Sequence, residues 1–285
     1  MTSVPAAGDP FARSWWPRVG LLALAVYVVY ACAQMDISAE RVETGLENAG
    51  HFFGRLFPPN FARWELLLKG LGESLQIAVL ASTLGIALAL PLGLMAARNL
   101  MPAWVSWPAR AVVVVARSLH PVIVAILFVK AVGFGALAGV LALTVASVGF
   151  IGKLFTEAIE EISLKQVEAV RATGAPFFSM LAYGVLPQVF SRFIGFATYQ
   201  LDSNLRNSTM VGIVGAGGIG GTLFAAFQRF DYDFVCAILI AIISLIMLGE
   251  LFATGVRAIF IGNATLADLF RRGAVQRRDR LVEDE

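Results

Sequence analysis

Six apolar stretches dominate this chain, and each is long enough to cross a lipid bilayer as a helix. Backbone groups inside a bilayer must be hydrogen-bonded within the protein, so a spanning segment is either a helix or part of a closed barrel. Charged residues make up 15% of the sequence, well below the roughly 25% of typical soluble domains. The sequence therefore predicts an all-α polytopic membrane protein with six transmembrane helices, at residues 19–35, 71–97, 109–131, 136–156, 188–216 and 234–261.

Lysine and arginine are distributed unevenly between the two sides of this predicted topology. Six spans place both termini on the same side, and cytoplasmic loops carry the excess of basic residues. One side would carry fourteen of them: Arg13, Arg18, Arg98, Arg110, Lys153, Lys165, Arg171, Arg192, Arg257, Arg271, Arg272, Arg277, Arg278 and Arg280. The other side would carry six: Arg41, Arg55, Arg63, Lys69, Lys130 and Arg229. This bias predicts that both termini lie in the cytoplasm.

Residues 188–227 are harder to assign, because 188–209 are polar for a span whereas 210–227 are apolar and rich in glycine. A separate span at 210–227 would move the C-terminal arginines outside, against the charge rule. We therefore expect a helix to about Arg206 and then a half-span or re-entrant segment, with a full span as the alternative. Irregular backbone at membrane depth lines cavities, and small residues also let helices pack closely. Both interpretations, a gate and close packing, apply to Gly215, Gly217, Gly218 and Gly220.

Two arginines fall inside predicted spans, where a charge costs roughly 2.5–3.5 kcal/mol and usually faces a partner or a cavity. Hydroxyl or amide side chains follow both, which gives a set of six residues: Arg117, Ser118, Arg206, Asn207, Ser208 and Thr209. Guanidinium, amide and hydroxyl groups suit an oxyanion, so these residues are predicted to line a translocation path. The alternatives are an ion pair between Arg206 and Asp202, four residues apart, and an arginine that reaches the membrane interface.

The sequence has no residue pattern typical of an enzyme or a metal site. Its two histidines and two cysteines lack ligand spacing, so we expect no catalytic residue, no metal and no cofactor. Residues 215–220 match the dinucleotide fingerprint in letters only, since no strand and helix flank them. No Walker A sequence is present, so a separate subunit would have to hydrolyse ATP. The net charge of +2 indicates no nucleic-acid partner.

Residues 160–187 combine charged and small residues between two apolar spans, on the predicted cytoplasmic side. The pattern predicts a helix from Glu160 to Ala172, ended by Gly174 in a left-handed conformation, and a second helix that starts at Pro176. We expect the Leu-Pro pair at 186–187 to end that second helix. Such a helix–turn–helix on the membrane surface is typical of a docking site.

The same segment resembles the cytoplasmic coupling motif of ABC importer permeases, in which Glu-Ala-Ala is followed at fixed spacing by Gly and Leu-Pro. The matching residues are Glu168, Ala169, Gly174, Leu186 and Pro187. Val170 replaces the second Ala of the motif, and Gly184 replaces its Ile. The resemblance implies that coupling helices at about 160–187 contact a cytoplasmic ATPase dimer.

Residues 67–262 as a whole resemble a type I ABC importer permease domain. They follow a segment, 1–66, with a cytoplasmic N-terminus, the first transmembrane helix and an outer interfacial part, and they precede a cytoplasmic tail, 263–285. Within that fold, residues 207–220 are similar to the phosphonate and phosphite transport permeases, as are Glu73-Ser74-Leu75 and Arg117-Ser118. The methionine permeases share the Gly-Ala-Gly-Gly run and are the alternative, and a non-transporting membrane scaffold is a third interpretation.

The resemblance also implies a localisation, a substrate class and partners for the protein. It predicts a multi-pass protein in the plasma (inner) membrane of a prokaryote, surrounded by lipid, that imports phosphonate, phosphite or a related phosphorus oxyanion. The predicted partners are a second copy of this chain, the ATPase dimer and an extracytoplasmic solute-binding protein. A different permease chain in place of the second copy stays an alternative.

Overall fold

A computed structural model describes the backbone of residues 15–35 and 38–283, and the side chains of these ranges other than residue 39 and residues 259–283. Helices and connecting turns make up the described residues, with no strand among them, which confirms the predicted all-α class. The chain divides into two units, residues 1–55 and 56–285. The first unit contains α1 (Trp16–Gln34) and almost all of α2 (Ala39–Leu56). Arg13 and the side chains of the C-terminal arginines lie outside the described residues.

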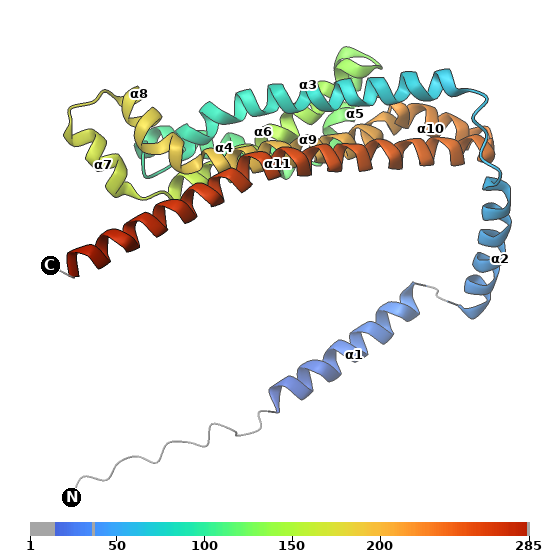
Figure 1. Ribbon diagram of the computed structural model, residues 1–285. Helices are drawn as coiled ribbons and strands as arrows, with labels where there is room; N and C mark the ends of the chain where they lie inside the picture. Colours follow the sequence, from blue (N-terminus) through green and yellow to red (C-terminus); the bar gives the residue numbers. More distant parts are fainter. Residues whose placement is uncertain (1–14, 36–37, 284–285) are drawn as a thin grey trace, which may run out of the picture. The chain divides into compact units, whose positions relative to one another are not determined.

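The second unit contains the other helices (Figure 1). In chain order they are α3 (Trp64–Ala96), α4 (Ala103–Ser118), α5 (Pro121–Val132), α6 (Ala136–Glu160), α7 (Leu164–Ala172), α8 (Phe177–Met180), the π-helical segment η1 (Leu181–Val185), α9 (Leu186–Ile213), α10 (Ile219–Gln228) and α11 (Tyr232–Glu283). Within this unit α3, α6, α9 and α11 run lengthwise, with α7 and α8 at one end and α10 at the other.

Five described helical segments are long and apolar enough to cross a membrane: Trp16–Gln34, Trp64–Ala96, Ala136–Glu160, Phe177–Ile213 and Tyr232–Ala258. A sixth span arises if α4 and α5 are counted as one segment, which is bent by 93°. The predicted span at 109–131 therefore corresponds to this bent pair and not to one straight helix. Proline disfavours the α conformation in the residue before it, and His120 before Pro121 is extended; its Nδ1 accepts a hydrogen bond from the Val122 amide at 3.3 Å.

The glycine-rich region also differs from its prediction. Helix α9 does not end near Arg206 but continues to Ile213, and a turn at 214–218 leads into α10. Helix α10 has 10 residues, so it rises about 15 Å, roughly half the hydrocarbon thickness of a bilayer. Its length agrees with a half-span and not with the alternative of a seventh full span.

The core of the second unit lies between α3 and α6, which make the most extensive helix–helix contact in the chain. Small and branched residues fill it, with Ile77, Ala81, Ala138, Ala142 and Leu143 among the most buried. Small residues let helix backbones approach closely in a membrane, where packing rather than water exclusion drives association. Helix α9 lies against both α3 and α6, so the side chains on its inner face meet the core directly.

Candidate functional site: coupling surface and translocation path

The predicted coupling segment forms a compact projection at one end of the second unit, where α7, α8 and η1 contact one another (Figure 1). The predicted continuous helix from Glu160 to Ala172 is wrong, because α6 ends at Glu160 and α7 begins only at Leu164. The side-chain amide of Gln188 holds the break: its Oε1 accepts from the Ser163 amide at 3.0 Å and its Nε2 donates to the Ser163 carbonyl at 3.3 Å.

The turn after α7 has the predicted left-handed glycine. Gly174 has φ = 77° and donates its amide to the carbonyl of Arg171 at 3.0 Å, which is how such a residue ends a helix. Pro176 then occupies the N-cap of α8, as expected. Gly174 is exposed, and a Cβ added there would have no atom within 4 Å. Position 174 therefore favours glycine because of its backbone conformation, and not because a side chain would clash there.

The Leu-Pro pair does not end the second helix, contrary to its prediction. The π-helical segment η1 continues directly into α9, and Leu186 and Pro187 form the first turn of α9. A helix tolerates proline in its first turn, where the missing N–H needs no partner, but the ring clashes further inside. The wider π-helical turn just before Pro187 accommodates the ring within an otherwise continuous helix.

The five motif residues are all exposed, namely Glu168, Ala169, Gly174, Leu186 and Pro187. Beneath them, Val167 of α7, Met180 of α8 and Val185 of η1 are buried in one apolar cluster with Phe155 and Ile159 of α6. A displacement of the exposed surface would therefore be transmitted to α6 through packed side chains rather than absorbed by a loose loop.

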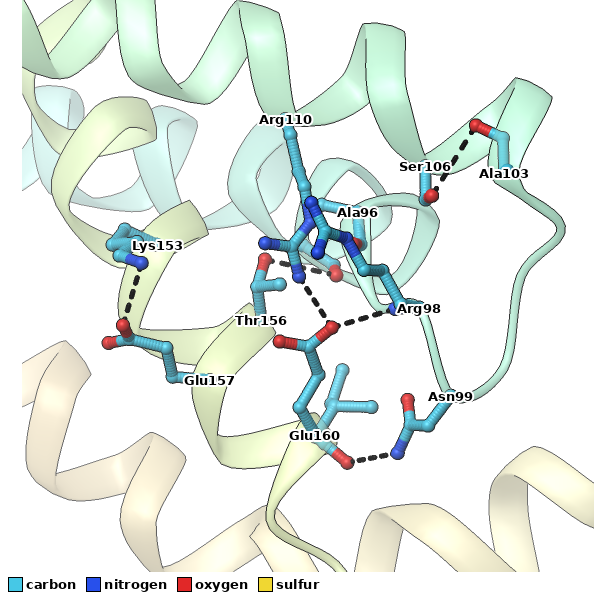
Figure 2. A network of polar contacts seen from close by, with 12 residues as sticks. Ala96, Arg98, Asn99, Ala103, Ser106, Arg110, Lys153, Thr156, Glu157 and Glu160 are labelled. Carbon is cyan, nitrogen blue, oxygen red and sulfur yellow. Dashed lines mark hydrogen bonds and ion pairs between the residues drawn. The ribbon is translucent and has the colours of Figure 1, made fainter.

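A network of ionic and hydrogen-bonded contacts joins α3, α4 and α6 close to this cluster (Figure 2). Glu160, the last residue of α6, accepts from the Arg98 amide at 2.8 Å and from the Arg110 guanidinium at 2.5 Å. Arg110 also donates to the Ala96 carbonyl at 2.9 Å, and Asn99 donates to the Ile159 carbonyl at 2.7 Å. Its bonded pairs are separated by up to 62 residues in the chain, so no sequence spacing predicts the network.

Arg117 lies in the last turn of α4, at the break between α4 and α5. It lines a cavity of about 180 Å³ together with Asn207, while Ser118 donates its hydroxyl to the Val115 carbonyl at 2.9 Å. Gln200 and Ser203, which were not among the predicted residues of the translocation path, also line this cavity. Gln200, Ser203 and Asn207 lie on one face of α9, and their spacing of three and four residues could have indicated this from the sequence.

Arg206 forms the ion pair that sequence spacing offered as an alternative. Its guanidinium lies 2.6 Å from the Asp202 carboxylate, one helical turn away. Ser208 is fully buried and donates its hydroxyl to the Leu205 carbonyl at 2.7 Å. Thr209 is half-buried, near the end of α9. The structure thus brings Arg117 and Asn207 together and gives Arg206 and Ser208 partners within α9.

A buried amide–hydroxyl network joins α9 to α3 and α6. Asn204 is 0% exposed and donates to the Ser82 and Ser147 hydroxyls, both at 2.9 Å. Gln200 donates to the Ser147 hydroxyl at 2.8 Å and to the Asn204 carbonyl oxygen at 3.0 Å. Polar side chains that bond across helices are retained in membranes because an unpaired polar group is costly there.

Three of the predicted gate glycines lie in the tight turn between α9 and α10, and the fourth, Gly220, lies in the first turn of α10. Gly215, Gly217 and Gly218 have positive φ values. Gly217 lies against the α6 N-terminus, where an added Cβ would be 2.7 Å from the Ala136 backbone. An added Cβ at Gly220 would overlap the Thr209 carbonyl oxygen. Close packing therefore describes this turn, and the Ser74 hydroxyl of α3 accepts a hydrogen bond from the Ile219 amide at 2.9 Å.

Comparison with known proteins agrees with this architecture. Residues 89–262 match the family described as binding-protein-dependent transport system inner membrane component. The chain belongs to this family. The permease is also similar to inward-facing structures of the methionine ABC transporter MetNI, one of which has a TM-score of 0.60 and 26% identity and covers 70% of this chain and 99% of the other. The all-helical type I permease fold is thus confirmed.

Two relatives extend the similarity outside the family domain. The phosphite transport system permease protein PtxC of Stutzerimonas stutzeri is 37% identical to this permease over 253 residues, which are 88% of this chain and 92% of the other. The phosphate-import permease protein PhnE of Mycolicibacterium smegmatis is 42% identical over 192 residues, 67% of this chain and 36% of that longer protein. Membership of the family makes this chain an inner-membrane transport component.

Proposed function

We propose that this chain is the permease of an ATP-driven importer for phosphite, phosphonate or a related phosphorus oxyanion. The observation that carries the proposal is its 37% identity to a phosphite permease along almost the full length of both chains. The methionine alternative has weaker support, since the methionine transporter structure is 26% identical and covers 70% of this chain. The phosphate-import relative supports a class of phosphorus oxyanions rather than phosphite alone, because phosphate differs from phosphite by one oxygen.

The permease would work with a cytoplasmic ATPase dimer, an outer solute-binding protein and a second copy of itself. Its termini would lie in the cytoplasm, as would the coupling surface. This orientation is supported by the excess of lysine and arginine on the predicted cytoplasmic side. The sequence contains no Walker A segment, so the partner would hydrolyse ATP while this chain forms the path.

The coupling surface would convert ATPase closure into movement of the spans. Glu168, Ala169, Gly174, Leu186 and Pro187 are the residues we assign to this contact, because all five are exposed on the projection formed by α7 to α9. The shared cluster with α6 would pass the motion into the core. Packed helices adopt discrete alternative arrangements rather than deforming smoothly, which suits a path that opens to one side at a time.

The path itself would be lined by residues of α4 and α9. We assign Arg117, Ser118, Arg206, Asn207, Ser208 and Thr209 to its vicinity. We assign the turn with Gly215, Gly217 and Gly218 to its gate, together with Gly220 at the start of α10. Support for the gate is the joint attachment of that turn to α3 and α6. A relative movement of these helices would necessarily move the turn.

The proposal is tested by ATPase stimulation in the reconstituted transporter. The complex in lipid vesicles should hydrolyse ATP faster when its binding protein is loaded with phosphite or aminoethylphosphonate than when that protein is empty. Stimulation only by a methionine-loaded binding protein would replace the substrate class and keep the permease role. A chain that neither binds an ATPase nor alters its rate would be a scaffold, contrary to the proposal.

A further inference from the structure

The cavity at the break between α4 and α5 has an unusual lining for a membrane segment. It is formed by residues of α4, α5, α6, α9 and the break between α4 and α5, and its polar side chains are Arg117, Gln200, Ser203 and Asn207. One guanidinium, two amides and one hydroxyl are therefore combined with apolar walls, and the described lining contains no carboxylate. The cavity carries a net positive charge next to neutral hydrogen-bonding groups.

Arg117 differs from Arg206 in having no acidic partner among the described residues. Arg206 lies 2.6 Å from Asp202, whereas none of the ion pairs in the described part of the chain involves Arg117. A charged side chain inside a spanning segment usually faces a cavity and is paired. Arg117 is exposed and lines this cavity, so its guanidinium is accessible to an anion from outside the chain.

The backbone around the cavity adds to this preference. Pro121 lines the cavity as the first residue of α5, so the positive end of that helix dipole lies beside it. Half-helix N-termini at a broken span are used in transporters to bind anionic groups. The end of α4 is held there by close contact with α6, because a Cβ at Gly149 would lie 2.6 Å from the Arg117 amide nitrogen.

We infer that this cavity is an oxyanion-binding subsite, with Arg117 as its charged ligand and Asn207 and Ser203 as neutral ligands, while Gln200 lines it with its amide nitrogen already bonded to Ser147 and Asn204. The inference rests on the proposed function and deepens it by naming where the phosphorus oxyanion binds during its passage. A volume of about 180 Å³ lies below the roughly 300–1,000 Å³ of pockets for drug-sized ligands. A cavity of this size suits a small anion such as phosphite, phosphate or a small phosphonate.

Arg117 also has a structural interpretation, which the experiment must separate from binding. A basic residue in the last turn of α4 offsets the negative end of that helix. That role would affect assembly of the chain, whereas the subsite role predicts a loss of anion affinity in a correctly assembled protein. Lys130 is a matched control, since it lies in the last turn of α5 on the same bent segment and is not part of the cavity lining.

The test measures phosphite binding to the permease–ATPase complex in lipid nanodiscs, by broadening of the phosphite signal in phosphorus NMR. The solute-binding protein is left out because it would bind the probe itself. Wild type and Lys130→Gln should broaden the signal equally. Arg117→Gln should weaken binding by about tenfold or more, the effect of losing a hydrogen bond to a charged group. Aminoethylphosphonate should displace the phosphite.

Equal broadening by Arg117→Gln and wild type would overturn the subsite, as would the absence of broadening in a wild-type complex that transports phosphite. If Arg117→Gln fails to assemble, Asn207→Ala decides, because within the described residues the Asn207 side chain makes only a long 3.4 Å bond to Ser203. Binding weakened by this variant supports the subsite, and unchanged binding contradicts it. Uptake of methionine alone by the wild-type transporter would overturn the proposed function together with the subsite.

Discussion

Gly174 offers the sharpest test of the coupling surface, because its structural demand can be isolated. Its φ of 77° is in the left-handed region, and a side chain added there would meet no atom within 4 Å. Replacement by leucine therefore costs only the free energy of holding an L-residue in the left-handed conformation, roughly 1–2 kcal/mol. That energy lowers the population of the native turn by about 5- to 30-fold relative to alternatives. We predict that Gly174→Leu inserts normally but uncouples ATP hydrolysis from uptake.

The assay is the ratio of substrate taken up to ATP hydrolysed by the transporter in lipid vesicles. The ratio should fall by at least about fivefold for Gly174→Leu, in line with the lower end of that conformational cost. Two further variants separate backbone conformation from bulk at the contact. Gly174→Ala is small but disfavours positive φ, whereas Gly174→Asn is larger and tolerates it. A normal ratio in both the leucine and the alanine variants would refute the reasoning.

Two predictions concern the polar networks that hold the helices together. Asn204→Ala removes three hydrogen bonds across and along helices, so it should lower the free energy of unfolding by about 2 kcal/mol at about 0.6 kcal/mol each. Detergent-titration unfolding measures this, with Asn207→Ala as a control expected near zero; a shift below about 0.5 kcal/mol would contradict the assignment. Glu160→Gln leaves Arg110 facing a neutral partner and should cost about 1 kcal/mol, more than Glu157→Gln, whose ion pair is within one helix and exposed. Equal effects of the two glutamate variants would show that the network across helices adds nothing.

The predictions from sequence were correct where the signal was local. The spans follow from runs of apolar residues, and the left-handed turn at Gly174 follows from the conformational freedom of glycine. His120-Pro121 is typical of a kink, and the break between α4 and α5 lies there. The size of the bend, 93°, does not follow from hydropathy, which gives only the extent of the apolar segment at 109–131. The continuation of η1 into α9 was missed because Pro187 is read as a stop unless it lies in the first turn of a helix.

The contacts within the candidate site were the part of the structure that the sequence predicted least well. Arg206 and Asp202 pair within one helix, so their spacing offered that pair in advance. Arg117 and Asn207 are 90 positions apart in the sequence, and only the packing of α4 and α9 against α6 brings both to one cavity. The same applies to the network around Glu160, which depends on the C-terminal ends of α3 and α6 meeting Arg110 in the middle of α4 (Figure 2).

Uptake by whole cells tests the central claim most directly. A strain without this gene and the same strain with the gene restored would be given labelled phosphite, aminoethylphosphonate and methionine in parallel, under phosphorus starvation. We predict that the strain without the gene loses uptake of at least one phosphorus oxyanion, that methionine uptake is unchanged, and that the restored gene recovers the loss. Loss of methionine uptake alone would contradict the oxyanion assignment, and unchanged uptake of all three would contradict the importer itself.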